Sequence, residues 1–70
     1  MKKLEVKTKK GTRNYDLSPA GSGFDVQRVD WGLLSSKKTF IGHGGSLSDA
    51  VLVARVDAGD HLVTTTRLHD

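Results

Sequence analysis

The segment GGSLSDAVLVARVDAG, residues 44–59, decides the fold of this chain. Ser46 is placed to cap a helix, and Asp49 stands three residues later, where a capping box usually has Glu or Gln. Gly59 follows as a helix stop. Between them, apolar residues recur at helical spacing and share one face: Leu47, Ala50, Val51, Ala54 and Ala58. The pattern predicts a helix over about residues 46–58 that lies across a sheet.

A hairpin is the alternative interpretation of the same region. Residues 51–56, VLVARV, are rich in β-branched side chains, and residues 57–60, DAGD, could turn the chain into residues 61–68, HLVTTTRL. We favour the helix because the cap, the glycine stop and the apolar spacing agree. Residues 61–68 are expected to be extended in either case. The alternative fold is all-β, with a hairpin over residues 50–68.

The residues before this segment alternate between apolar and polar side chains, as strands do. Leu4 and Val6 share one face, and Tyr15 and Leu17 share one face after a turn at Gly11. A first hairpin is therefore expected near the amino terminus.

A loop and a second hairpin are expected next. Residues 18–23, SPAGSG, have the composition of a loop. Residues 24–31, FDVQRVDW, carry two apolar residues in one phase and two in the other. Either a bulge near Gln27 and Arg28 resets the alternation, or this strand is apolar on both faces at opposite ends, and we favour the bulge. Residues 37–43, KKTFIGH, should form the strand that pairs with it.

Together these patterns predict one α+β domain over residues 1–70. The expected architecture is a small antiparallel sheet of three to five strands with one helix packed on one face. The expected segments follow in order along the chain: a basic first strand or arm (1–10), the sheet (11–45), the helix (46–58) and an extended carboxy-terminal segment (60–70).

The strand and helix order resembles a known kind of DNA-binding domain in outline. Three strands followed by a capped helix, over about residues 12–58, are similar to the sheet-plus-helix domains of tyrosine-recombinase arm-binding modules and AP2-type proteins. The resemblance implies a sheet laid in the major groove of DNA. The middle strands mix acidic and basic residues, namely Asp25, Arg28, Asp30, Lys37 and Lys38. Their face is expected to be weakly charged, which disfavours sequence-specific reading of DNA.

The net positive charge of the chain comes from its first thirteen residues. The chain has 11 Lys and Arg against 8 Asp and Glu, a net charge of +3. Residues 1–13 alone carry +5, and residues 14–70 carry −2. We favour a solvated edge strand whose lysines block edge-to-edge pairing, and the alternative is an arm that neutralises phosphates. The candidate nucleic-acid contacts are Lys2, Lys3, Lys7, Lys9, Lys10, Arg13, Lys37 and Lys38.

The composition disfavours an enzyme. A chain of 70 residues has little core to support a deep catalytic cavity, and the absence of Cys removes disulfides, thiolate zinc sites and Cys nucleophiles. The three histidines, at 43, 61 and 69, are 18 and 8 residues apart, a spacing that fits no metal motif. Residues 42–46, GHGGS, are interpreted as a turn rather than an anion site. We expect no catalytic residues, no metal and no cofactor.

The chain carries no membrane signal. No apolar run approaches the roughly 20 residues that cross a bilayer, and MKK at the start leads into polar residues rather than the apolar stretch of a signal peptide. The expectation is a cytoplasmic protein without a membrane partner.

The four aromatic residues are Tyr15, Phe24, Trp31 and Phe40, and in a small domain they are expected to form the core. If the sheet face opposite the helix is open, Tyr15 or Trp31 would instead be a binding anchor. Our first hypothesis is a small non-catalytic interaction module that binds a protein partner, or a second copy, through its sheet face or edge. Single-domain chains of this size are frequent among the accessory proteins of phages and mobile elements, and an accessory protein of that kind is therefore one expectation. The alternative is DNA binding through the basic amino-terminal segment, which requires its cations to converge on one surface.

Overall fold

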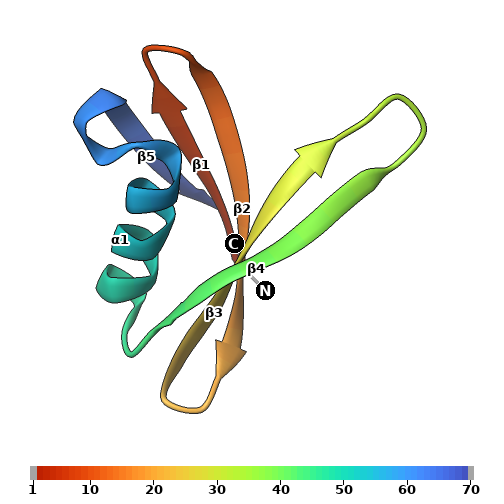
Figure 1. Cartoon of the computed structure of the whole chain (residues 1–70). Helices are drawn as coiled ribbons and strands as arrows, with labels where there is room; N and C mark the ends of the chain where they lie inside the picture. Colours follow the sequence, from red (N-terminus) through yellow and green to blue (C-terminus); the bar gives the residue numbers. More distant parts are fainter. Residues whose placement is uncertain (1, 70) are drawn as a thin grey trace.

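The strands and the helix follow the order expected for an α+β domain (Figure 1). The computed structural model describes residues 2–69. The elements are β1 (Lys2–Thr8), β2 (Gly11–Ala20), β3 (Gly23–Trp31), β4 (Ser36–Gly44), α1 (Leu47–Ala58), a 3-10 turn (Asp60–Leu62) and β5 (Val63–His69). The five strands form one antiparallel sheet with α1 packed on one face, so the predicted fold class is confirmed.

The strand order is β4-β3-β2-β1-β5, which places β1 inside the sheet. After α1 the chain returns and β5 pairs with β1 from Lys3 opposite His69 to Thr8 opposite Val63. The prediction that the first strand lies at the edge of the sheet is therefore wrong, because β1 pairs with β2 on one side and with β5 on the other. The edges of the sheet are β4 and β5.

The loop expected at residues 18–23 is mostly strand. Pro19 and Ala20 still pair with β3, and Gly21, with φ 61°, forms the turn together with Ser22. Pro19 is tolerated because β1 pairs with β2 only up to Leu17, so the side of β2 that faces β1 needs no N–H at Pro19.

The apolar residues of β3 lie on both faces of the sheet. β3 pairs with β2 in unbroken register, and the irregularity lies in its pairing with β4, where Ile41 is the extra residue opposite Val26 and Gln27. A bulge in β3 near Gln27 and Arg28 is therefore not present. Val26 packs beneath α1, and Val29 faces the opposite side.

The local signals around α1 act as their chemistry predicts. The Ser46 Oγ accepts a hydrogen bond of 3.2 Å from the Asp49 N–H, and Gly59 ends the helix with φ 91°. The hairpin alternative for residues 50–68 is wrong. Ala50 and Ala54 are fully buried against the sheet, where they join a core that also contains Leu4, Val6, Tyr15, Leu17 and Val26.

Glycine in β4 allows the helix to approach the sheet closely. A Cβ on Gly44 would lie 2.2 Å from the backbone nitrogen of Ala50, and a Cβ on Gly42 would lie 3.0 Å from Cγ1 of Val53. Neither glycine has a positive φ. Glycine at these two positions is therefore required by the space between β4 and α1 and not by an unusual backbone conformation.

Candidate functional site

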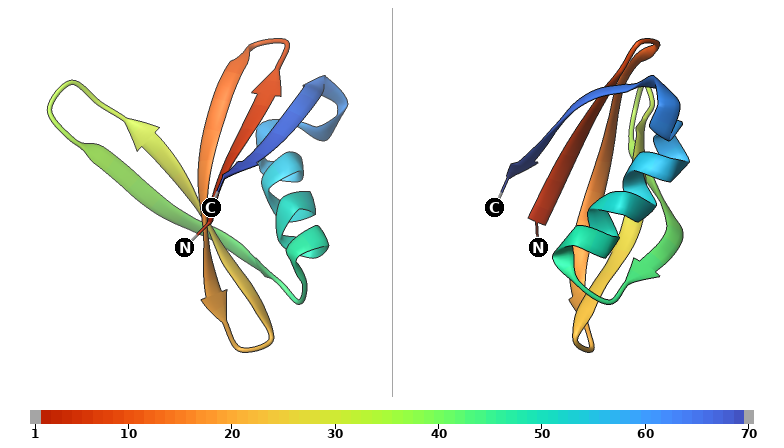
Figure 2. Two further views of the ribbon diagram at one scale, coloured as in Figure 1. Left: turned by 180° about the vertical axis from the view of Figure 1, so that it is seen from behind. Right: turned by 90° about the vertical axis from the view of Figure 1, so that its left-hand side faces the viewer.

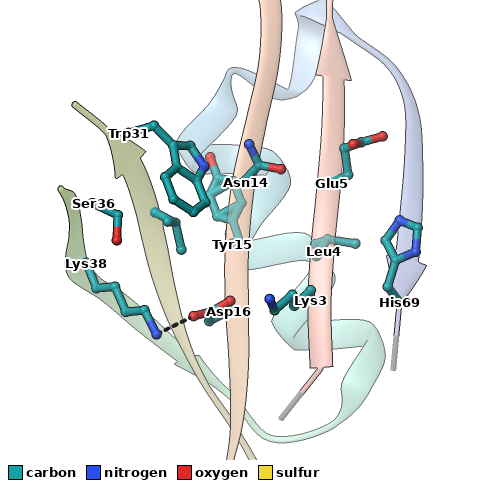
Figure 3. A pocket seen from close by; sticks show the side chains of 11 residues that line it. Lys3, Leu4, Glu5, Asn14, Tyr15, Asp16, Trp31, Ser36, Lys38 and His69 are labelled. Carbon is teal, nitrogen blue, oxygen red and sulfur yellow. Dashed lines mark ion pairs between the residues drawn. The ribbon is translucent and has the colours of Figure 1, made fainter. Parts of the chain in front are cut away.

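The face of the sheet opposite α1, here called the open face, is not covered by any other element of residues 2–69 (Figures 1 and 2). It contains a hollow of about 420 Å³ that runs across the strands from Trp31 on β3 to His69 on β5. Figure 3 shows the side chains of Lys3 and Asp16 between these two ends, and that of Lys38 reaching toward Asp16 from β4. The hollow is polar at its centre and bordered by an indole at one side.

A buried carboxylate forms the floor of this hollow. Asp16 is 4% exposed, and the Nζ of Lys38 lies 2.7 Å from its Oδ2. Lys3 lies directly across from Asp16 on β1. The charge of Asp16 is therefore compensated within the sheet, and Lys38 is engaged in this ion pair.

Other opposite charges alternate across the open face. The Nζ of Lys7 lies 4.0 Å from Oε1 of Glu5, and Nδ1 of His43 lies 2.9 Å from Oδ1 of Asp25. Such half-exposed pairs contribute little to stability, on the order of 0 to 1 kcal/mol each. Their consequence here is electrostatic, because they leave the open face without a large potential of one sign.

The eight candidate nucleic-acid contacts do not converge on one surface. Alternation along the strands places Lys3, Lys7 and Lys38 on the open face. On the side of the sheet that carries α1 lie Lys2, Arg13 and Lys37. The turn between β1 and β2 holds Lys9 and Lys10.

Tyr15 lies in the core and offers no binding surface. It is 1% exposed, and its hydroxyl donates a hydrogen bond of 2.8 Å to Oδ2 of Asp57 on α1. Burial and the neighbouring Asp57 carboxylate raise the pKa of Tyr15 well above its usual value. Arg28 on β3 also reaches Asp57, with its Nη1 3.1 Å from Oδ1. These contacts tie the end of α1 to the sheet.

Two of the four aromatic residues lie outside the core, so the prediction of an aromatic core is wrong for them. Trp31 is 74% exposed and Phe40 is 59% exposed, whereas Phe24 packs at the border of the core. The pairing of β2 with β3 extends only to Asn14 opposite Val29. Trp31 lies beyond that pair and has β4 as its only neighbouring strand.

Four large apolar side chains of the β3–β4 hairpin are exposed. Leu33 and Leu34 at its tip are 104% and 99% exposed, values close to those of a residue in an extended peptide. With Trp31 near the tip, and with Phe40 farther along β4 opposite Gln27, they form what we call the hairpin patch. The sequence analysis did not select the two leucines, although their place between Gly32 and two serines, in a connection that polar residues usually occupy, was an available signal.

A second apolar surface lies between α1 and β4. Four apolar residues line a shallow hollow of about 350 Å³, here called the helix hollow, and one charged residue borders it: Ile41, Leu52, Val53, Val56 and Asp57. Leu52 is 53% exposed and Val56 is 64% exposed, so both point away from the sheet.

Within residues 2–69, no three His, Asp or Glu side chains are grouped as metal ligands. No helix in the described part of the chain is long and apolar enough to cross a membrane. No family model, no curated protein and no solved structure matches the sequence or the fold.

Proposed function

We propose that this chain is a non-catalytic interaction module that binds a protein partner through the hairpin patch. One observation carries the proposal, namely the exposure of four large apolar side chains on a single hairpin. An apolar surface of this kind on a small domain marks an interaction site, because water contact with it is unfavourable. Burying one such side chain is worth about 1.5–3 kcal/mol, so the patch could supply much of the free energy of binding.

The distribution of charge supports an apolar mode of binding. The cations are divided between the two sides of the sheet and a turn, and those of the open face lie beside carboxylates. An interface based on the hairpin patch should therefore depend little on salt, whereas binding that neutralises phosphates weakens steeply as salt is added.

Nucleic-acid binding is the second candidate. It is favoured by the presence of Lys3, Lys7 and Lys38 on the same side of the sheet as Trp31 and Phe40, because bases stack on exposed aromatic rings. Three phosphate contacts would give a log–log salt slope of about −2 on single strands. We place nucleic-acid binding second because the other five candidate contacts lie on the α1 side of the sheet or in the turn between β1 and β2.

The experiment uses the hairpin patch to find the partner and to test it. A photo-cross-linking residue replaces Leu34 in one variant and Thr65, an exposed residue of β5, in a control variant. A protein cross-linked only from position 34 is purified and titrated against the chain. Trp31 is the single tryptophan and reports the contact, since its emission should shift to the blue when partner side chains replace water.

The double substitution Leu33→Ser and Leu34→Ser should weaken this binding at least tenfold, which corresponds to about 1.4 kcal/mol. Raising the salt concentration should change the affinity little. The proposal is contradicted if no protein binds through the hairpin patch, while an oligonucleotide shifts the Trp31 emission and dissociates as salt is added. Blue-shifted emission with phospholipid vesicles alone would also contradict it.

A further inference from the structure

The tip of the β3–β4 hairpin, which carries Leu33 and Leu34, lies at the start of β4 and away from α1, whereas the helix hollow lies where α1 packs against β4 (Figure 1). Seven large apolar side chains are exposed in residues 2–69, and six of them belong to these two surfaces. The seventh, Leu68, lies on β5. The uncovered apolar surface of the chain is thus concentrated in two places and is not scattered.

The tip of the hairpin and the helix hollow are both apolar. Leu33 and Leu34 lie in the connection between β3 and β4, and their side chains are fully exposed. The helix hollow is concave and apolar, and the one charged residue at its border, Asp57, already accepts hydrogen bonds from Tyr15 and Arg28. Two leucines that enter the hollow would therefore meet apolar side chains and no unpaired charge.

The hairpin of one chain cannot fill the hollow of the same chain. Ser36, at the end of β4 next to the tip, and Ile41 are five residues apart along the strand, a span of about 17 Å. Figure 1 and the left view of Figure 2 show the end of the hairpin pointing away from α1. Any contact between the two surfaces must therefore form between two molecules.

We infer that the partner of the hairpin patch is a second copy of this chain, whose helix hollow receives Leu33 and Leu34. The inference rests on the proposed function of the patch. Two such contacts, related by a two-fold axis, close into a dimer, whereas a single one-way contact would leave both kinds of surface open at the ends. The exposed surface of Leu33, Leu34, Leu52 and Val56 is on the order of 600 Å² per copy, so two such contacts would bury about 1,200 Å² in total, the lower end of the range for stable interfaces.

Sedimentation equilibrium over a series of concentrations measures the mass of the wild-type chain and of two variants that carry opposite new charges, each alone and in a mixture. The wild-type chain should have twice the mass of a monomer. Leu34→Lys on the hairpin and Leu52→Asp in the hollow should each weaken association at least tenfold, because each variant places an unpaired charge in an apolar contact. An equimolar mixture of the two variants should dimerise again, since the new lysine meets the new aspartate and the other contact is intact. Leu68→Lys is the control and should leave the dimer unchanged.

Both test positions are exposed, so circular dichroism should show the wild-type fold for each variant. Leu33→Lys provides a second variant of the hairpin with the same expected result. A wild-type chain that stays monomeric at all concentrations overturns the inference, and so does a dimer that persists in Leu34→Lys. If the chain is monomeric and binds another protein through the hairpin patch, the inference that the partner is a second copy is overturned. The proposed function of the patch would then still hold.

Discussion

Substitution of two neighbouring glycines tests how closely α1 approaches the sheet. In Gly44→Ala the new Cβ would lie 2.2 Å from the nitrogen of Ala50, 2.6 Å from its Cα and 2.6 Å from the carbonyl carbon of Asp49. All three atoms are backbone, so no flexible side chain can give way. The first turn of α1 would have to move about 1.2–1.5 Å from β4 to restore ordinary van der Waals contact.

The expected loss of stability follows from two opposing effects. Forcing a methyl group into a close contact costs about 1–3 kcal/mol, and rigid backbone on the opposing side favours the upper part of that range. Replacing glycine by alanine also lowers the conformational entropy of the unfolded chain, which raises the free energy of unfolding by about 0.4–1 kcal/mol. The net loss for Gly44→Ala should be about 2 kcal/mol, or roughly 8–16 °C in the melting temperature of a domain of this size.

Gly45→Ala is the matched control. Its Cβ would meet only Oδ2 of Asp49, at 3.9 Å, and Gly45 has no positive φ. This variant should keep the wild-type melting temperature or exceed it slightly because of the restricted unfolded chain. Thermal and urea unfolding followed by circular dichroism measure both variants. Equal stability of Gly44→Ala and Gly45→Ala would refute the close approach of α1 to β4.

Three further predictions concern single contacts. The pKa of Tyr15 is raised in the folded chain above its usual value near 10, so its protonated form contributes to stability below about pH 10 and this contribution is lost as the pH rises further. Urea unfolding should therefore show that the wild-type chain loses free energy of unfolding above pH 10. Tyr15→Phe should lose less of it over the same pH range. Ser46→Ala should lose about 1 kcal/mol in thermal unfolding because the helix cap is removed, whereas Ser48→Ala on the exposed first turn should not. A double-mutant cycle between Asp16 and Lys38, with alanine at each position, should give a coupling of about 1 kcal/mol that falls in high salt, and zero coupling in low salt would contradict the ion pair.

The elements that sequence analysis predicted correctly are those with local causes. Ser46 and Gly59 determine the ends of α1 through contacts within a few residues, and glycine turns join strands that are neighbours in sequence. The position of β1 depends instead on pairing with β5, whose residues lie about 60 positions later in the chain. No local pattern distinguishes an edge strand with lysines from an internal strand whose lysines face an uncovered side of the sheet.

The exposure of Trp31 has a geometric cause that composition does not contain. A helix of 12 residues is about 18 Å long, and a strand of nine residues such as β4 is about 30 Å long. α1 crosses β4 near Gly42 and Gly44, so it cannot also cover the other end of the strand. β2 ends its pairing with β3 before Trp31 is reached. The outer half of the hairpin therefore has neither a helix above it nor a strand on its inner side.

The tip of the β3–β4 hairpin is surrounded by water, where polar side chains have a lower free energy than apolar ones. The presence of two leucines there is the argument for a binding function. Leu33 and Leu34 make no contribution to the core, since their side chains are fully exposed in the free chain. Serine or asparagine at these positions would serve the connection equally well and would avoid contact of apolar surface with water. The two leucines add to the stability of the system only when another surface covers them. The conflict between the sequence of the hairpin tip and its position in the fold is the kind that a binding site produces, because the site is adapted to a state that the isolated chain does not contain.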